Sequence, residues 1–75
     1  MVHPQLIQFG LHLKRMRMER RLSQEELGLI ADLDRTYISG IERGVRNVSL
    51  TTIFRIAKAL DVPVSALFTD LESTR

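Results

Sequence analysis

The stretch from Gln24 to Arg43, QEELGLIADLDRTYISGIER, decides the fold of this chain. Its apolar side chains lie four apart in the first half and three apart in the second, which places them on one face of each of two short helices, with one more apolar residue in the turn between them. These apolar positions are Leu27, Ala31, Leu33, Ile38 and Ile41. Two helices joined by a tight turn can bury such a set only by crossing at a steep angle. The pattern therefore predicts a helix-turn-helix.

Polar residues at the expected helix ends agree with this pattern. Ser23 followed by Glu26 forms a capping box, which predicts that the first helix begins directly after Ser23. Asp32 is expected in the left-handed turn conformation, which Asp tolerates better than most residues. Asp34 is then expected to cap a second helix over 35–43 that stops at a glycine. Gly28 is expected where the two helices come close together.

Three further helices are predicted on either side of the motif, with no strand-like alternation. The first should span about 5–20, with Pro4 at its start, and bury Leu6, Phe9, Leu13 and Met16. The fourth should be capped by Ser49 and bury Leu50, Ile53, Ile56, Ala57 and Leu60. Pro63 should open a short fifth helix that ends near Phe68. We expect one domain over 1–75, with its core at about 5–68 and a tail at 69–75.

Length and composition limit the alternatives. A core built from 75 residues rarely supplies more than about 3–5 kcal/mol of net stability, so a partner subunit is expected. The chain has no cysteine, which leaves neither a disulfide framework nor a thiolate metal site. Residues 1–60 carry ten basic and six acidic side chains, whereas 61–75 carry one basic and three acidic. Without a signal-like or membrane-spanning run, the protein is expected to be soluble and cytoplasmic.

The segment from Asp34 to Asn47, DRTYISGIERGVRN, resembles the controller proteins of bacterial restriction-modification operons, within the Cro/CI-type (XRE-like) helix-turn-helix family. The resemblance extends from about Phe9 to Phe68. It implies an all-α, compact five-helix fold of the lambda-repressor type, with the motif at the second and third helices. It also implies an ion pair between Arg17 and Glu42, for which two separate surface charges are the alternative. Arg21 and Asp32 depart from the family pattern, where glycine is frequent.

The exposed face of the expected second motif helix predicts contacts with DNA base edges. The candidates are Arg35, Thr36, Tyr37, Ser39 and Arg43. Arg35 can donate two parallel hydrogen bonds to guanine. A cation in the first turn interacts unfavourably with the helix dipole, which indicates that Arg35 has a role other than helix stability. Tyr37 and Ser39 could instead be ordinary surface residues, and Arg43 could be a partner of the C-terminal dipole. Gly40 would keep this face low enough to enter a groove.

Phosphate contacts are expected on both sides of that helix. The candidates are Gln24, Arg46, Asn47, Ser49 and Thr52. Gln24 would combine its amide with free backbone N–H groups at a helix start. Arg46 could also enter a narrow minor groove. Ser49 is expected to serve first as a cap.

The last two expected helices carry more apolar surface than so small a domain needs. Phe54, Val64, Leu67 and Phe68 are predicted at a homodimer interface, with completion of the monomer core as the alternative. His3 and His12 lie far from any cluster of thiols or carboxylates, so no metal, cofactor, small-molecule ligand or enzyme activity is expected.

The resulting hypothesis is a homodimeric, sequence-specific transcription regulator, most similar to a restriction-modification controller, that binds double-stranded DNA at pseudo-palindromic operators. The resemblance implies activation from one site and repression from an adjacent weaker one. Two alternatives keep the fold: an antitoxin-type module that binds a protein partner and represses its own operon, or a phage or plasmid repressor.

Overall fold

The computed structural model describes residues 3–69, which form four α-helices followed by one 3-10 helix and contain no strand. The elements are α1 (Pro4–Glu19), α2 (Gln24–Ala31), α3 (Arg35–Glu42), α4 (Leu50–Leu60) and η1 (Val64–Phe68). The all-helical prediction agrees with this architecture, but the fifth helix is 3-10 and not α. The 3-10 helix after Pro63 spans only five residues, and the Ala66 amide donates to the Pro63 carbonyl oxygen at 2.9 Å in the tighter i to i+3 pattern. The predicted tail, apart from Thr69, lies outside the described residues.

The predicted N-terminal caps are present. The Glu26 amide donates to Ser23 Oγ at 2.9 Å, and the Ser23 amide donates to Glu26 Oε1 at 2.7 Å, which completes the capping box of α2. Asp34 and Ser49 cap α3 and α4, each accepting a hydrogen bond from an amide of the first turn. These caps fix where α2, α3 and α4 begin.

Three turns place a residue other than glycine in the left-handed region: Arg21 with φ 57°, Asp32 with φ 60° and Asp61 with φ 58°. The conformation predicted for Asp32 is confirmed. Arg21 stands where the resemblance implies a frequent glycine, and it adopts the conformation that glycine would favour. Both departures from the family pattern therefore leave the turn geometry intact, at the cost of some backbone strain.

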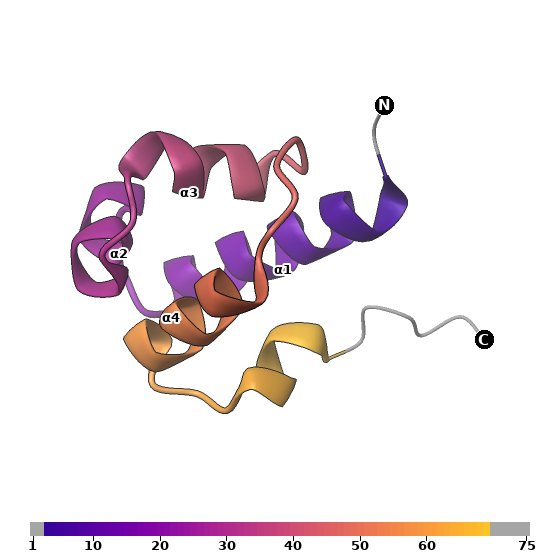
Figure 1. Ribbon diagram of the computed structural model, residues 1–75. Coiled ribbons are helices and arrows are strands. Elements are labelled where there is room, and N and C mark those ends of the chain that lie inside the picture. The colour runs from indigo at the N-terminus through magenta and orange to yellow at the C-terminus, as the bar shows by residue number, and fades with distance from the viewer. Residues whose placement is uncertain (1–2, 70–75) are drawn as a thin grey trace.

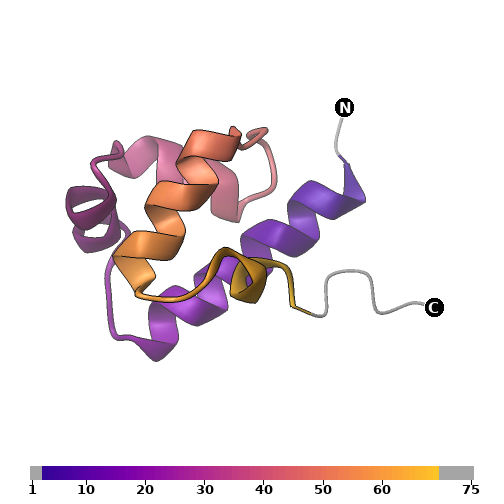
Figure 2. The same cartoon turned by 60° about the horizontal axis from the view of Figure 1, so that its bottom comes forward.

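The helices enclose one core, to which every element contributes. In Figure 1, α3 runs along one edge of the molecule and η1 along the opposite edge, and Figure 2 shows α1, α4 and η1 from below. Helix α3 packs against α1 and α2, α2 packs against α4, and η1 packs against α1 and α4. The buried apolar residues are Phe9, Leu13, Met16, Leu27, Ala31, Ile38, Ile41, Ile56, Ala57, Leu60 and Leu67.

Two predicted core residues lie outside the buried core. Leu6 on α1 is only half-buried. Leu50 is 68% exposed, because it is the first residue of α4 and points away from the helix packing. The later apolar positions of that helix, Ile56, Ala57 and Leu60, are buried as predicted, and Ile53 packs partly against the core.

Glycines permit two close approaches that position α3. A Cβ at Gly10 would lie 2.6 Å from the Glu42 carbonyl oxygen and closer still to that of Ile41, so α1 and α3 meet backbone to backbone. A Cβ at Gly28 would lie 2.5 Å from the Leu33 carbonyl oxygen. Gly28 was expected to allow a close contact between two helices. It instead makes room for the turn of the motif.

None of the helices within residues 3–69 is long and apolar enough to cross a membrane.

Candidate nucleic-acid interface

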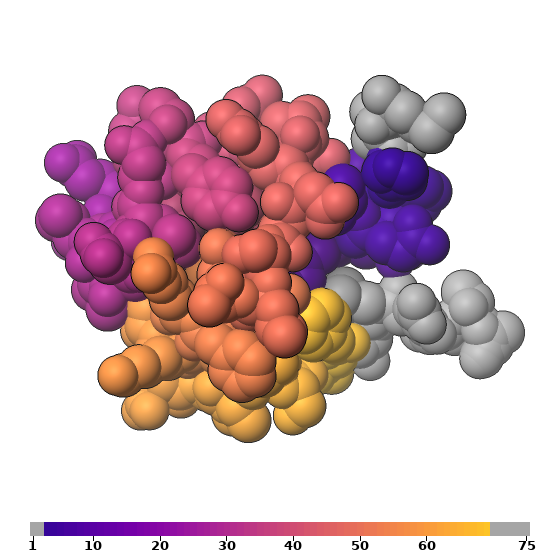
Figure 3. Space-filling view, viewed as in Figure 1, coloured from indigo at the N-terminus to yellow at the C-terminus, as the bar shows by residue number. Residues whose placement is uncertain are grey.

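The N-terminal half of α3 presents its polar side chains to solvent. Arg35 and Thr36 are exposed, and Tyr37 and Ser39 are half-buried at the edge of the packed face. The opposite face of the same helix buries Ile38 and Ile41 completely or nearly so. In the space-filling view of Figure 3, α3 and the loop after it form one uncovered region at the top of the molecule. A helix whose tip is exposed while its apolar face is packed into the domain has the shape needed to enter a DNA groove.

Thr36 is more constrained than its exposure suggests. Its hydroxyl and its amide both donate to the Asp34 carboxylate. Hydrogen bonds from Thr36, its hydroxyl first, hold the pKa of Asp34 below its ordinary value. The cap therefore occupies the hydroxyl proton of Thr36, an exposed residue whose methyl group takes no part in the cap.

The other cations near α3 differ in placement. Arg43 is exposed and occupies the C-terminal cap position of the helix. Its amide donates a hydrogen bond to the carbonyl oxygen of Ser39, one turn earlier. Arg46 follows in the loop, but its guanidinium lies back over the Tyr37 ring, with Cζ 5.7 Å from the ring centroid. The predicted loop cation is thus located on the side of α3.

A buried ion pair holds the other end of α3. Arg17 Nε donates to Glu42 Oε2 at 2.6 Å, and Arg17 Nη2 donates to Glu42 Oε1 at 3.0 Å, in the bidentate geometry that planar recognition of a carboxylate requires. Arg17 Nη1 donates to the Leu22 carbonyl oxygen at 2.6 Å. The hydrogen bond that Arg17 donates to Glu42 raises the pKa of Arg17 against the lowering effect of burial. The expected ion pair is present and ties α1 to α3.

Gln24 joins this ion pair. Its Nε2 donates to Glu42 Oε1 at 3.0 Å, so the same carboxylate fixes α1, the start of α2 and the end of α3. Gln24 remains half-buried at the surface, and its second amide N–H is available for a phosphate. Sequence reasoning missed the contact with Glu42, because a separation of eighteen residues leaves no local pattern.

The remaining phosphate candidates are not all available. Thr52 is 7% exposed, and its hydroxyl oxygen accepts from Ser49 Oγ at 2.9 Å inside the α4 cap. Thr52 is therefore a poor phosphate contact, because its hydroxyl is nearly buried and is already bonded to the capping residue Ser49. Ser49 is exposed and acts as the cap that was expected. Asn47 is exposed, and it also lines a cleft between α1, α4 and η1.

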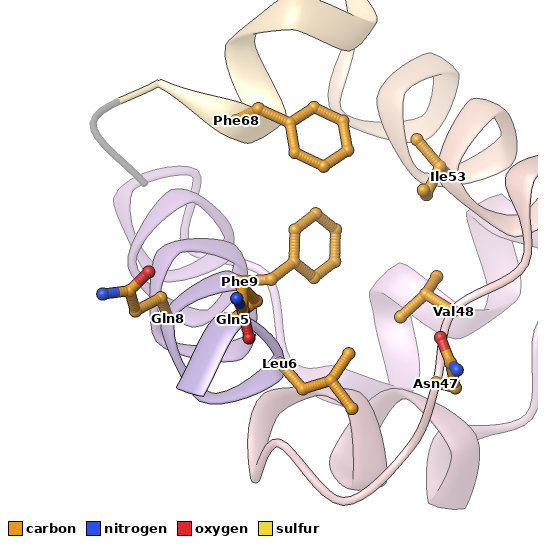
Figure 4. Close-up of a pocket in the computed structure, with 8 residues that line it drawn as sticks. All are labelled: Gln5, Leu6, Gln8, Phe9, Asn47, Val48, Ile53 and Phe68. Carbon is orange, nitrogen blue, oxygen red and sulfur yellow. The ribbon is translucent and has the colours of Figure 1, made fainter. Parts of the chain in front are cut away.

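That cleft lies beside the apolar C-terminal surface. It has a volume of about 480 Å³, and Figure 4 shows its apolar walls facing one another across the opening. Phe68 is 44% exposed and packs against Phe9 with the ring centroids 5.4 Å apart and the ring planes tilted by 36°, while Phe54 is 56% exposed on α4. Leu67 is completely buried in the monomer, so the interface prediction is wrong for it, because a partner cannot bury it further.

His12 has a structural role that its isolation in the sequence did not reveal. It is 9% exposed, and its Nε2 lies 2.8 Å from the Ala66 carbonyl oxygen, which ties η1 to α1. Arg15 Nη2 lies 2.7 Å from Nδ1. Because the guanidinium can only donate, Nδ1 accepts and Nε2 carries the proton that bonds Ala66.

Comparison with known proteins agrees with this geometry. Residues 13–67 match the helix-turn-helix family. The chain is 49% identical over 67 residues to the control protein C.MunI of a Mycoplasma species. The matched segment covers 88% of this chain and 90% of that protein. The crystal structure of the restriction-modification controller protein C.AhdI from Aeromonas hydrophila superposes with a TM-score of 0.87 at 45% identity, covering 88% of this chain and 100% of that one.

The chain belongs to the restriction-modification controller proteins of the helix-turn-helix family. Members of this family are DNA-binding transcription regulators. A further structural neighbour is the C.Esp1396I tetramer in complex with its natural 35 base-pair operator, with a TM-score of 0.81 and 39% identity over 89% of this chain and 88% of that one.

Proposed function

We propose that this protein is a homodimeric controller that binds pseudo-palindromic operator DNA by placing the N-terminal end of α3 in the major groove. The supporting observation is the asymmetry of α3, whose polar tip is exposed while its apolar face and its C-terminal end are locked into the domain. The proposed base-reading residues are Arg35, Thr36, Tyr37, Ser39 and Arg43. Gln24, Asn47 and Ser49 are the proposed phosphate contacts.

The dimer is proposed to form through the apolar surface of α4 and η1. Phe54 and Phe68 are exposed and Val64 is half-buried, and Phe68 also lines the cleft of Figure 4. A domain of this size gains stability by burying such side chains against a second copy, at about 1.5–3 kcal/mol per large side chain before association costs. Two copies related by a two-fold axis would present two α3 tips to half-sites roughly 34 Å apart.

DNA selected from a random pool by the purified protein tests the groove assignment. Selection should return a two-fold symmetric sequence, and the logarithm of affinity should fall against the logarithm of salt with a slope of about −5 to −9 for six to ten neutralised phosphates. A pool without sequence preference, or an affinity that does not respond to salt, would overturn the proposal.

Sedimentation of a Phe54→Asp variant tests the interface. A charge at this exposed position leaves the monomer fold intact but must be desolvated in the dimer, so the variant should sediment as a monomer and bind the operator more weakly. Leu29→Asp is the matched control, because Leu29 is 77% exposed on α2, outside the proposed interface, and its replacement should leave the dimer intact. A dimer that persists in Phe54→Asp would contradict the interface.

A further inference from the structure

The side chain of Arg46 lies across α3 at Gly40. A Cβ built on Gly40 would lie 2.6 Å from Arg46 Cγ and 3.4 Å from Arg46 Nε. No side chain can therefore occupy this position of α3 without moving the arginine. Gly40 is itself buried, although it belongs to the helix that carries the exposed polar tip. The absence of a side chain at Gly40 forms a shallow seat in which the aliphatic part of Arg46 rests.

The head of Arg46 is directed toward the N-terminal end of α3. Its Cζ lies 5.7 Å from the centroid of the Tyr37 ring, one helical turn before Gly40. This separation is within the range in which an aromatic face attracts a cation. The stem and the head thus make two successive contacts along α3, and both lead toward the helix tip.

The guanidinium nevertheless keeps its hydrogen-bonding capacity. Arg46 is exposed, and within residues 3–69 its contact with Tyr37 is not accompanied by a hydrogen bond or ion pair to protein. A guanidinium that rests on a ring by its face retains N–H donors along its edges, and these donors form the fork that fits guanine O6 and N7. A side chain that is already placed also loses less conformational entropy on binding.

The loop does not need Arg46 to hold its path. The Val45 amide donates to the Gly40 carbonyl oxygen at 3.0 Å, and the Gly44 amide donates to that of Ile41 at 3.0 Å. Gly44 adopts a φ of 76°, which turns the chain at this point. Backbone contacts thus close the end of α3, so a purely structural role leaves the packing of Arg46 on Gly40 unexplained.

We propose that Gly40 is a positioning residue that seats Arg46 against Tyr37, so that Arg46 acts as a second base-reading arginine beside Arg35. This inference rests on the proposed function, and it replaces the expectation that Arg46 contacts a phosphate from the loop. A phosphate contact would strengthen binding to every sequence, whereas a seated fork beside the α3 tip selects a base. Operator specificity at one position then depends on a glycine that touches no DNA.

The test compares four variants on the operator that wild-type protein selects and on a library with each half-site base replaced. Arg46→Ala should lose about 5- to 150-fold in affinity for the operator. It should also lose its preference at one base pair of each half-site. Arg46→Lys retains the charge but not the fork, so it should lose the same preference while keeping the salt dependence. Gly40→Ala should lose preference at the same base pair, because the new methyl group displaces Arg46.

The double variant Gly40→Ala with Arg46→Ala separates positioning from other effects. If the glycine acts through the arginine, the double variant binds no more weakly than Arg46→Ala alone, which is the signature of coupled residues. Thermal melting accompanies each measurement, and Gly40→Ala should melt close to the wild-type temperature, because the helix propensity of alanine, about 1 kcal/mol above that of glycine, offsets the cost of moving the Arg46 side chain.

Three results would overturn the inference while leaving the proposed function intact. These are a uniform loss of affinity over the whole library in Arg46→Ala, a wild-type preference in Arg46→Lys, and a wild-type preference in Gly40→Ala. Failure of the wild-type protein to select any sequence would instead refute the proposed function.

Discussion

The two ends of α3 differ in what holds them. At the C-terminal end, Glu42 is 6% exposed and receives three hydrogen bonds from Arg17 and Gln24, and the backbone touches α1 at Gly10. At the N-terminal end, the cap at Asp34 is the principal fixed contact, and Arg35 is exposed. A recognition helix can leave its tip uncovered because several contacts at its other end fix its position. Substitutions at the C-terminal end should therefore change stability, and those at the tip should change DNA affinity.

The largest effect is expected from Glu42→Ala. Removing the carboxylate leaves Arg17, a residue that is only 8% exposed, without its charged partner, and such a loss costs about 3–5 kcal/mol. Urea unfolding at a fixed protein concentration measures this change. A double variant, Arg17→Met with Glu42→Leu, removes both charges and should recover most of the stability. An equal loss in the single and double variants would show that packing, and not charge, holds this end.

At the opposite end, Arg35→Ala should weaken operator binding by about 1–3 kcal/mol, or roughly 5- to 150-fold. The melting temperature should not fall, because Arg35 is exposed and a cation in the first turn opposes the helix dipole. Fluorescence anisotropy with labelled operator gives the affinity. A variant that loses stability and affinity together would contradict the division of labour between the two ends of α3.

A smaller loss is expected from Gly10→Ala. The new methyl group would meet the carbonyl oxygens of Ile41 and Glu42, which belong to helix backbone and cannot turn aside. Overpacking of this kind costs about 1–3 kcal/mol, offset by up to about 1 kcal/mol of helix propensity. Gly40→Ala is the matched control, because its methyl group meets only a flexible arginine. If both variants unfold at the same urea concentration, the close approach of α1 and α3 does not limit stability.

This contrast also marks how far the sequence could be interpreted. Helical periodicity and the capping residues predicted α2, α3 and the start of α4 almost to the residue, because local rules determine them. The 3-10 form of η1 and the burial of Leu67 depend on how a short C-terminal segment meets α1 and α4, which no local pattern encodes.

For the site, exposure of the α3 tip follows from the position of the apolar stripe, so Arg35 and Thr36 could be chosen from the sequence. Side-chain placement could not be obtained in this way. Gln24 bonds Glu42 and Arg46 rests on Gly40, and both contacts depend on rotamers that distant neighbours select. Glycine inside a helix was the available signal, since its cost in propensity requires a packing reason.

The smallest expected effect is the acid dependence of the cap at the α3 tip. Hydrogen bonds from Thr36 lower the pKa of Asp34 in the folded protein, so the stability that this cap contributes is present above the ordinary carboxyl pKa of 3.8 and is lost as pH falls through the lower folded value. Asp34→Asn keeps a capping oxygen but cannot titrate. The difference in urea midpoint between wild type and Asp34→Asn should thus stay constant above about pH 4 and change only below it. A difference that already changes near neutral pH would show that another group at this end controls the tip.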